Sequence, residues 1–152
     1  MSDIEFKDKG LKQLMKAFKR IPVVQIGILG SSPRTDGGQS NAAVGAAHEF
    51  GTSKLPRRSF LREPITDHLD AYLQKAGAFD KAKLNEVVKN ATLKPYMDKV
   101  AIVCEEIVQD AFGSGGFGKW KPSDMTDKKV QMTLVETQQL RRSITSKVVD
   151  AT

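Results

Sequence analysis

The stretch that decides the fold is a corner: residues 48–52 read HEFGT, and after a short basic gap residues 58–64 read RSFLREP. A helix-like run ends at Gly51, because glycine is the residue that most readily stops a helix. The aromatic and aliphatic pair Phe60 and Leu61 then opens the next helix. The pattern predicts two helices joined at a corner, and it contains no set of residues typical of a catalytic site.

Upstream of the corner, the pattern predicts a helix followed by a strand. Apolar residues recur at helical spacing from Leu11 to Phe18 with lysines on the other face, and Pro22 ends the pattern. Residues 23–28 then alternate, with branched apolar side chains on one side. This alternation predicts a strand with one strongly apolar face.

A polar loop, residues 30–41, separates that strand from the next helix. Nearly every residue in it favours turns, and none offers a hydrophobic anchor. Two interpretations stay open: a floppy connector, or a loop that becomes ordered only against a neighbouring subunit. Ser40 or Asn41 is expected to cap the helix that follows. The apolar side of that helix is expected to carry Val44, Ala47 and Phe50.

Helical patterns continue beyond the corner. One begins near Pro64 and is interrupted at Gly77, and a shorter one covers residues 84–88. The clearest pattern covers residues 93–111, where apolar residues step by three and four, and it predicts a central core helix. Cys104, the single cysteine, lies on the apolar face of that helix and is expected to be buried.

The elements together predict an α+β fold. A last strand is expected at residues 143–149, which gives a single small domain over residues 1–152. Several helices would pack on a small antiparallel β-sheet, with the long polar loop outside. A chain of this length can bury a sizeable core. No apolar run approaches the ~20 residues of a membrane helix, and no signal-peptide layout is present, so we expect synthesis and use in a cytosol.

The net charge of +6 has two interpretations. Acidic and basic residues are interspersed, which favours a solvated, mildly basic surface. The alternative is contact with acidic protein surfaces or with DNA.

No set of residues predicts catalysis. Residues 113–120 nearly match a phosphate-binding loop, but they follow a helix instead of a strand, and Trp120 replaces the required hydroxyl. His48 and His68 lack partners at metal-ligand spacing, so each is expected to be a hydrogen-bonded histidine on a helix surface. The glutamates at 105 and 106 are expected to be solvated. We therefore expect no enzyme activity, cofactor or metal.

A second informative segment follows the glycine-rich turn. Trp120, the only tryptophan, is expected to fold back and be substantially buried, because its apolar area outweighs the cost of ordering the turn. Thr137 is well placed to cap a short turn carrying Leu140, which would pin the segment down.

These two segments resemble small tail-completion and virion-morphogenesis proteins of tailed bacteriophages. In that family the first segment is typically HEFGT…PARPFLRP, and the second resembles G-x-W-x-P-L-s-x-x-T…K…L-x-x-T-G-x-L-x-x-S-I. Ser123 and Gln138 depart from the second pattern, which usually has leucine and glycine there. The structural motif in this chain comprises His48, Phe50, Gly51, Phe60, Leu61, Trp120, Pro122, Thr137 and Leu140.

The resemblance implies a structural virion protein that completes the tail or joins the tail to the head. It implies a homo-oligomeric ring, expected to be a hexamer, that contacts neck or connector and tail-tube proteins. DNA would pass through the lumen without sequence-specific binding, and no membrane would be contacted. Tail-terminator, tail-completion and head-closure roles stay open.

Such a ring needs two complementary patches on each subunit. We expect them in the loop at residues 30–41 and in the basic corner at residues 54–62, where arginines can pair with carboxylates. The candidate contact residues are Arg34, Asp36, Lys54, Arg57, Arg58 and Arg62. The alternatives are a small basic nucleic-acid-binding or DNA-packaging accessory protein, and a regulatory or toxin-like cytosolic domain.

Overall fold

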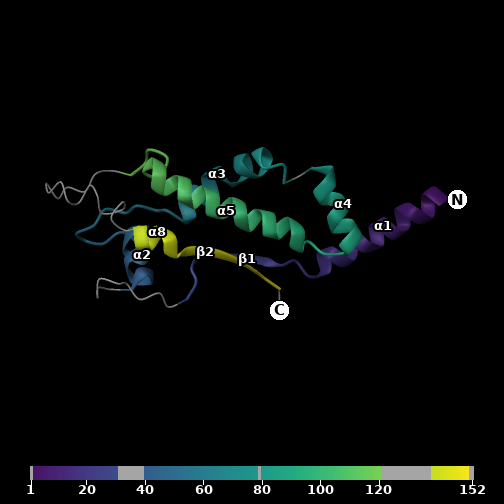
Figure 1. Ribbon diagram of the computed structural model, residues 1–152, viewed down its shortest axis with the longest axis horizontal. Helices are drawn as coiled ribbons and strands as arrows, with labels where there is room; N and C mark the ends of the chain where they lie inside the picture. The colour runs from purple at the N-terminus through teal and green to yellow at the C-terminus, as the bar shows by residue number, and fades with distance from the viewer. Residues whose placement is uncertain (1, 31–39, 79, 121–137, 151–152) are drawn as a thin grey trace. The chain divides into compact units, whose positions relative to one another are not determined.

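The computed structural model describes residues 2–30, 40–78, 80–120 and 138–150 (Figure 1). This part of the chain forms six helices and two strands, and the strands pair in one small antiparallel sheet. The predicted α+β fold is therefore confirmed. In chain order the elements are α1 Ser2–Lys19, β1 Val23–Ile28, α2 Asn41–Phe50, α3 Arg62–Lys75, α4 Lys81–Asn90, α5 Lys94–Ser114, α8 Gln138–Ser143 and β2 Ile144–Val149.

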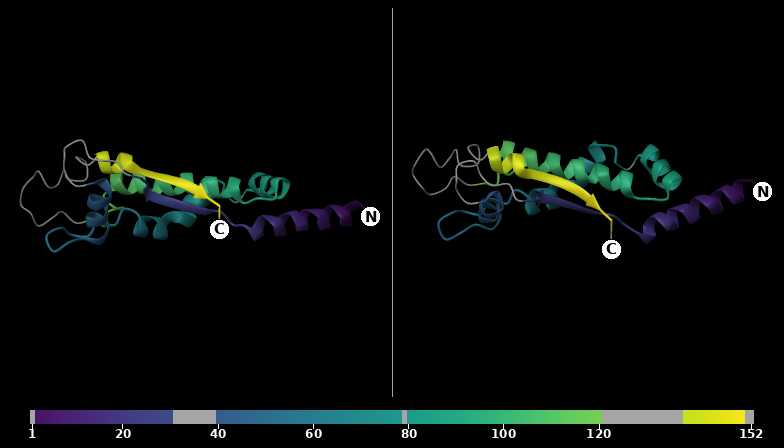
Figure 2. Two further views of the ribbon diagram at one scale, coloured as in Figure 1. Left: turned by 90° about the horizontal axis from the view of Figure 1, so that it is seen from below. Right: turned by 60° about the horizontal axis from the view of Figure 1, so that its bottom comes forward.

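The contacts divide the chain into two compact units. The first unit comprises Met1–Gln25, Asp70–Val103 and Lys147–Thr152, and the second comprises Ile26–Leu69 and Cys104–Ser146. The helices α3 and α5 and both strands pass from one unit to the other. Figure 2 shows β2 running alongside β1, as the pairing of the two strands requires.

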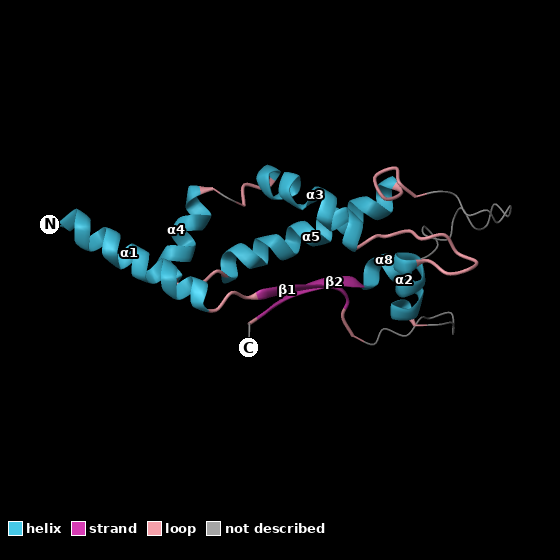
Figure 3. Cartoon of the chain, turned by 180° about the vertical axis from the view of Figure 1, so that it is seen from behind, coloured by secondary structure: helices cyan, strands magenta, loops and turns pink. Residues whose placement is uncertain are grey.

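In the first unit, α1 and α4 contact one another (Figure 3). The helix predicted from the apolar spacing in α1 is present, and among residues 8–19 of that helix Ala17 is the buried one. Leu11, Met15 and Phe18 are each more than half exposed. Leu14 is half-buried, so only part of the predicted apolar face of α1 is packed.

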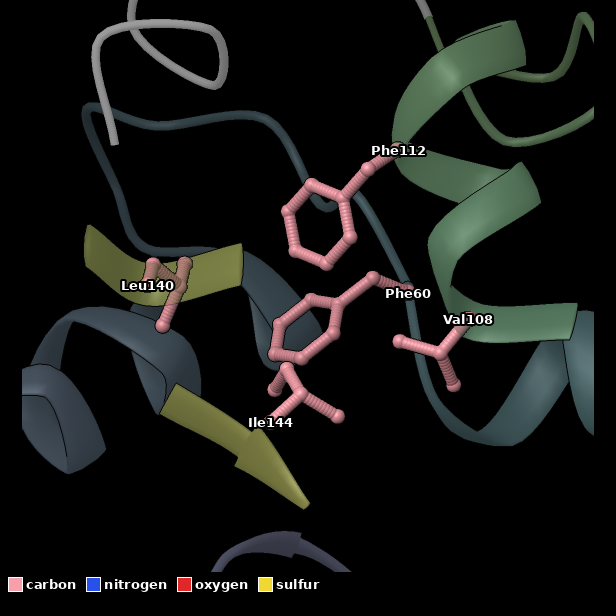
Figure 4. Packing of buried hydrophobic residues seen from close by; sticks show 5 residues of the cluster. All are labelled: Phe60, Val108, Phe112, Leu140 and Ile144. Carbon is pink, nitrogen blue, oxygen red and sulfur yellow. The ribbon is translucent and has the colours of Figure 1, made fainter. Parts of the chain in front are cut away.

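In the second unit, a cluster of five buried side chains forms the core (Figure 4). Phe60 precedes α3, Val108 and Phe112 come from α5, and Leu140 and Ile144 come from α8 and the start of β2. The burial of Leu140 is as predicted. Cys104, also on α5, is buried as predicted, and burial raises the pKa of its thiol.

The helix α2 corrects one expectation. Phe50 is 62% exposed, whereas Asn41, Gly45, His48 and Glu49 are buried, so the helix is turned away from the predicted face. Gly45 explains the rotation, because a Cβ there would lie 2.8 Å from Cδ1 of Ile28. Only a glycine allows the backbone to approach the core this closely. The predicted helix start and end are correct, since Ser40 caps α2 and Gly51 follows it.

The glutamates of α5 behave differently from one another. Glu106 is exposed, as predicted. Glu105 is not a freely solvated charge, because its Oε1 accepts hydrogen bonds from the backbone N–H of Ser146, at 2.7 Å, and from the Ser146 hydroxyl. A strand that returns from far along the chain thus supplies the partner, and no local pattern signals such a contact.

Candidate functional site at the corner before α3

Glu49 organises the corner between α2 and α3. Its Oε2 accepts hydrogen bonds from the backbone N–H groups of Phe60 at 2.9 Å and Leu61 at 3.1 Å. Its Oε1 accepts from the Ser59 hydroxyl at 2.8 Å and from the N–H and Nε of Arg62, both at 3.2 Å. The carboxylate therefore caps α3 from another helix and lies where the helix dipole favours negative charge.

The buried charge of Glu49 is stabilised by these donors. Burial by itself raises the pKa of the carboxyl, but the hydrogen bonds outweigh it and the net pKa is lowered. The donors in order of effect are the N–H of Leu61, the hydroxyl of Ser59, and the N–H groups of Phe60 and Arg62. Because each of these bonds favours the ionised form, Glu49 is a carboxylate at neutral pH.

Ser59 links this cap to α3 itself. Its hydroxyl donates to Glu49 and accepts from the backbone N–H of Glu63 at 3.1 Å. Leu61 stands immediately before α3 and has no side-chain oxygen with which to cap it. The N-terminal N–H groups of α3 are therefore satisfied by Glu49 and Ser59.

His48 and Arg58 lie inside the corner. Both residues are buried, with 3% of His48 and 5% of Arg58 exposed. The backbone N–H of Arg58 donates a hydrogen bond to the carbonyl oxygen of His48 at 2.7 Å. Burial, followed by the charge of Arg58, lowers the pKa of His48 to about 4. The expectation of a surface histidine at position 48 is wrong, because α2 turns its polar side inward. His48 Nδ1 has no hydrogen-bond partner among the described residues.

The candidate contact residues separate into two groups. Arg58 is buried and so does not present a charge to a partner, in contrast to the expectation. Lys54, Arg57 and Arg62 are exposed. Arg34 and Asp36 lie in the loop outside the described residues.

Two of the exposed arginines are held in place by neighbours. Arg57 pairs with Glu63. Arg62 pairs with Glu49 through Nε and lies over the Phe50 ring, with its Cζ 4.7 Å from the ring centroid. The corner therefore presents an ordered surface of Phe50, Arg57, Arg62 and Glu63, which we call the corner patch.

Trp120 closes the corner from the side of α5. Its indole N–H donates to the Ser59 carbonyl oxygen at 3.1 Å, and its ring meets Phe112 edge-on with centroids 5.9 Å apart. Phe112 in turn packs on Phe60 at 5.1 Å. The indole is half-buried, so the expected packing on the core is present, although the side chain is less deeply buried than the substantial burial predicted.

The glycine-rich turn is shaped around this indole. Gly116 has φ +68°, and a Cβ there would lie 2.3 Å from the indole nitrogen. Lys119, the lysine of the failed phosphate-loop match, bonds to Asp67 on α3 through Nζ and Oδ2 at 2.5 Å. The turn therefore attaches the end of α5 to α3. Pro122 and Thr137 lie outside the described residues.

The hydrogen bonds of Glu49, Ser59 and Trp120 connect α2, the start of α3 and the turn that follows α5. Within the described ranges, no group of three or more His, Cys, Asp and Glu side chains is placed to hold a metal ion. Of the helices that the structure describes, none combines the length and apolarity needed to cross a membrane. The absence of enzyme activity, cofactor and metal stays a prediction.

Glu49 and Ser59 are the residues that the sequence analysis missed. A usable signal was present, because α3 begins after Phe60 and Leu61, neither of which can cap a helix. A carboxylate or hydroxyl must then come from elsewhere, and Glu49 lies two residues before the glycine that ends the preceding helix. No family model, curated protein or solved structure matches the chain.

Proposed function

We propose that this chain is a structural virion protein of a tailed bacteriophage that completes the tail or joins the tail to the head. The observation that carries the proposal is the contact between its two phage-like segments. Trp120 of the second segment donates to the carbonyl oxygen of Ser59 in the first, across 61 positions of sequence. The resemblance of two distant segments to one protein family supports the proposal more strongly when the two segments contact each other in the fold.

The corner patch supports action through protein–protein contacts. Phe50 is 62% exposed although it is a large aromatic residue, and Arg62 lies across its ring. Aromatic residues and arginines are enriched where interfaces bind most strongly, and ordered side chains lose less entropy when a partner arrives. The partners proposed are neighbouring copies in a ring, of which a hexamer is the expected form, and the neck or connector and tail-tube proteins.

A second candidate function is a small basic nucleic-acid-binding or DNA-packaging accessory protein. The net charge of +6 favours it. The two candidates differ in where the protein ends up, because a structural component stays in the finished particle and an accessory protein does not.

The first test measures assembly. Light scattering coupled to gel filtration, with negative-stain microscopy, is expected to show rings of the purified chain. The double variant Phe50→Ala/Arg57→Ala is expected to remain monomeric. The control Ile102→Ala/Lys75→Ala also removes one exposed hydrophobic residue and one exposed lysine or arginine, and it should still form rings. Equal loss of assembly in both variants would exclude the corner patch as the interface.

The second test concerns the particle. Mass spectrometry of purified virions of the phage that encodes the chain is expected to detect it at a fixed number of copies. Deletion of its gene is expected to leave separate heads and tails. Complete, infectious particles without the chain would overturn the proposed function.

A further inference from the structure

A basic groove lies in the first unit, at the C-terminal half of α1. It has a volume of about 730 Å³, and four of its lining residues are Lys12, Lys16, Lys19 and Arg20. Asp150 is the one carboxylate among the residues that line it. The groove therefore carries a clear excess of positive charge.

The three lysines share one side of α1, and Arg20 follows directly after the last residue of the helix. The lysine spacing of four and three residues confines the three side chains to an arc of about 60° on the helix. In the part of the chain that the structure describes, none of the four forms an ion pair. Like charges placed so close together repel one another, and no carboxylate of the described chain pairs with them. The groove is therefore complementary to an extended anion supplied by another molecule.

The dimensions suit a phosphodiester backbone. Lys12 and Lys19 are separated by about 10 Å along the helix axis, from the rise of 1.5 Å per residue. One DNA strand carries a phosphate every ~3.4 Å along its axis, so roughly three phosphates fit within this span. A compact anion would engage only part of the row.

The groove lacks the side chains that read bases. Apart from its charged residues, it is lined by Met15, Ala17, Pro22, Ala91 and Thr92. The Thr92 hydroxyl oxygen already accepts from the Lys94 N–H at 3.2 Å. No asparagine, glutamine or arginine pair is placed to form the bidentate contacts that distinguish bases.

We propose that this groove binds the phosphate backbone of DNA without reading its sequence. The inference does not depend on the corner patch, which lies in the other unit, and it adds a defined DNA contact to the proposed virion role. The rival partner is an anionic membrane, because Leu11, Met15 and Phe18 are exposed beside the lysines. DNA is favoured because the cations line a hollow, into which a backbone can project, instead of flanking a flat apolar face.

The test compares two triple variants with equal loss of charge. Lys12→Gln/Lys16→Gln/Lys19→Gln removes the row in the groove. Lys75→Gln/Lys81→Gln/Lys89→Gln is the matched control, because these lysines are exposed in the same unit and form no ion pair with the described residues. Binding of a 30-base-pair duplex of random sequence is measured by fluorescence anisotropy at several salt concentrations.

For the wild type, neutralisation of the roughly three phosphates along the row predicts a slope of log K against log salt of about −2.7. The groove variant is expected to reduce that slope by roughly 3 and to weaken binding at least tenfold at low salt. The control is expected to bind nearly as the wild type does, and an unrelated duplex should bind equally. An equal loss in the two variants, or no binding by the wild type at low salt, would refute the proposal.

A vesicle measurement separates the rival partner. Vesicles containing phosphatidylserine are offered to the wild type and to Leu11→Ser/Phe18→Ser. Vesicle binding that this variant abolishes, together with no DNA binding, would assign α1 to a membrane surface and overturn the inference. DNA binding by a chain that is missing from virions would support the groove and reject the proposed virion role, so the two proposals can fail separately.

Discussion

Replacement of Glu49 by glutamine tests the account of the corner most directly. The substitution keeps the shape of the side chain and removes its charge. Oε1 of Glu49 accepts three hydrogen bonds and Oε2 accepts two, whereas a glutamine offers one oxygen and places an NH₂ group at the other position. At least two donors at the start of α3 therefore lose their acceptor.

The magnitude follows from burial. Ser59 and Phe60 are 3% and 1% exposed, so water does not replace a lost acceptor for their donors. Hydrogen bonds to a charged group contribute about 1.5–3 kcal/mol each, compared with about 0.5–1.5 kcal/mol for neutral pairs. The exposed Arg62 groups recover water and contribute little. We expect Glu49→Gln to lower the free energy of unfolding by about 3 kcal/mol at neutral pH.

The assay is urea unfolding followed by the fluorescence of Trp120, whose indole bonds to Ser59 within the same corner. Glu106→Gln is the matched control, because Glu106 is exposed on α5, and its midpoint should not change. The lowered pKa of Glu49 means that its stabilisation is present above the usual value of 4.5 and is lost as the pH falls through the folded pKa. The difference between variant and wild type should therefore shrink in acid. Equal midpoints at pH 7 would refute the capping role of Glu49.

Three further predictions concern the same unit. Trp120→Ala should destabilise the fold by about 3 kcal/mol, which is the low end for a large aromatic residue because the indole is half-buried. Trp120→Phe should cost only about 1 kcal/mol, because it removes the hydrogen bond of the indole N–H and keeps an aromatic ring. Both losses are measured by thermal unfolding. Gly116→Ala should destabilise the fold by about 1–3 kcal/mol, because φ at this residue is +68° and the new Cβ would meet the indole of Trp120. The control Gly113→Ala lies in α5 with open space around it and should stabilise the fold by about 0.5–1 kcal/mol. The pKa of His48 is lowered from 6.5 to about 4, so its contribution to stability is fully present above pH 6.5 and is lost as the pH falls towards 4. His48→Gln should remove that part of the pH dependence, on the order of 3 kcal/mol, and an unchanged pH profile would show that the histidine is not buried as a neutral base.

The candidate site was only partly predictable from the sequence. The corner, the helix end at Gly51 and the start of the next helix after Phe60 and Leu61 follow from local patterns. The rotation of α2 does not, because it depends on Gly45 meeting Ile28, a contact between separate elements. The sequence therefore predicted Phe50 as a core residue, and the structure exposes it in the corner patch.

The sequence by itself located most of the elements, although α1 begins at Ser2, well before the first predicted apolar position at Leu11. Periodicity, caps and glycine stops act within a few residues, and they correctly located α1, β1, α2, α5 and β2. The tertiary structure alone decided the environment of the charged residues. Glu49 caps α3 and Glu105 bonds to a strand far along the chain, because separate segments supply the donors of their hydrogen bonds. Arg58 is buried because neighbouring segments exclude water from it. A local pattern specifies which residues share one side of a helix or strand, but it does not specify which other segment packs against that side.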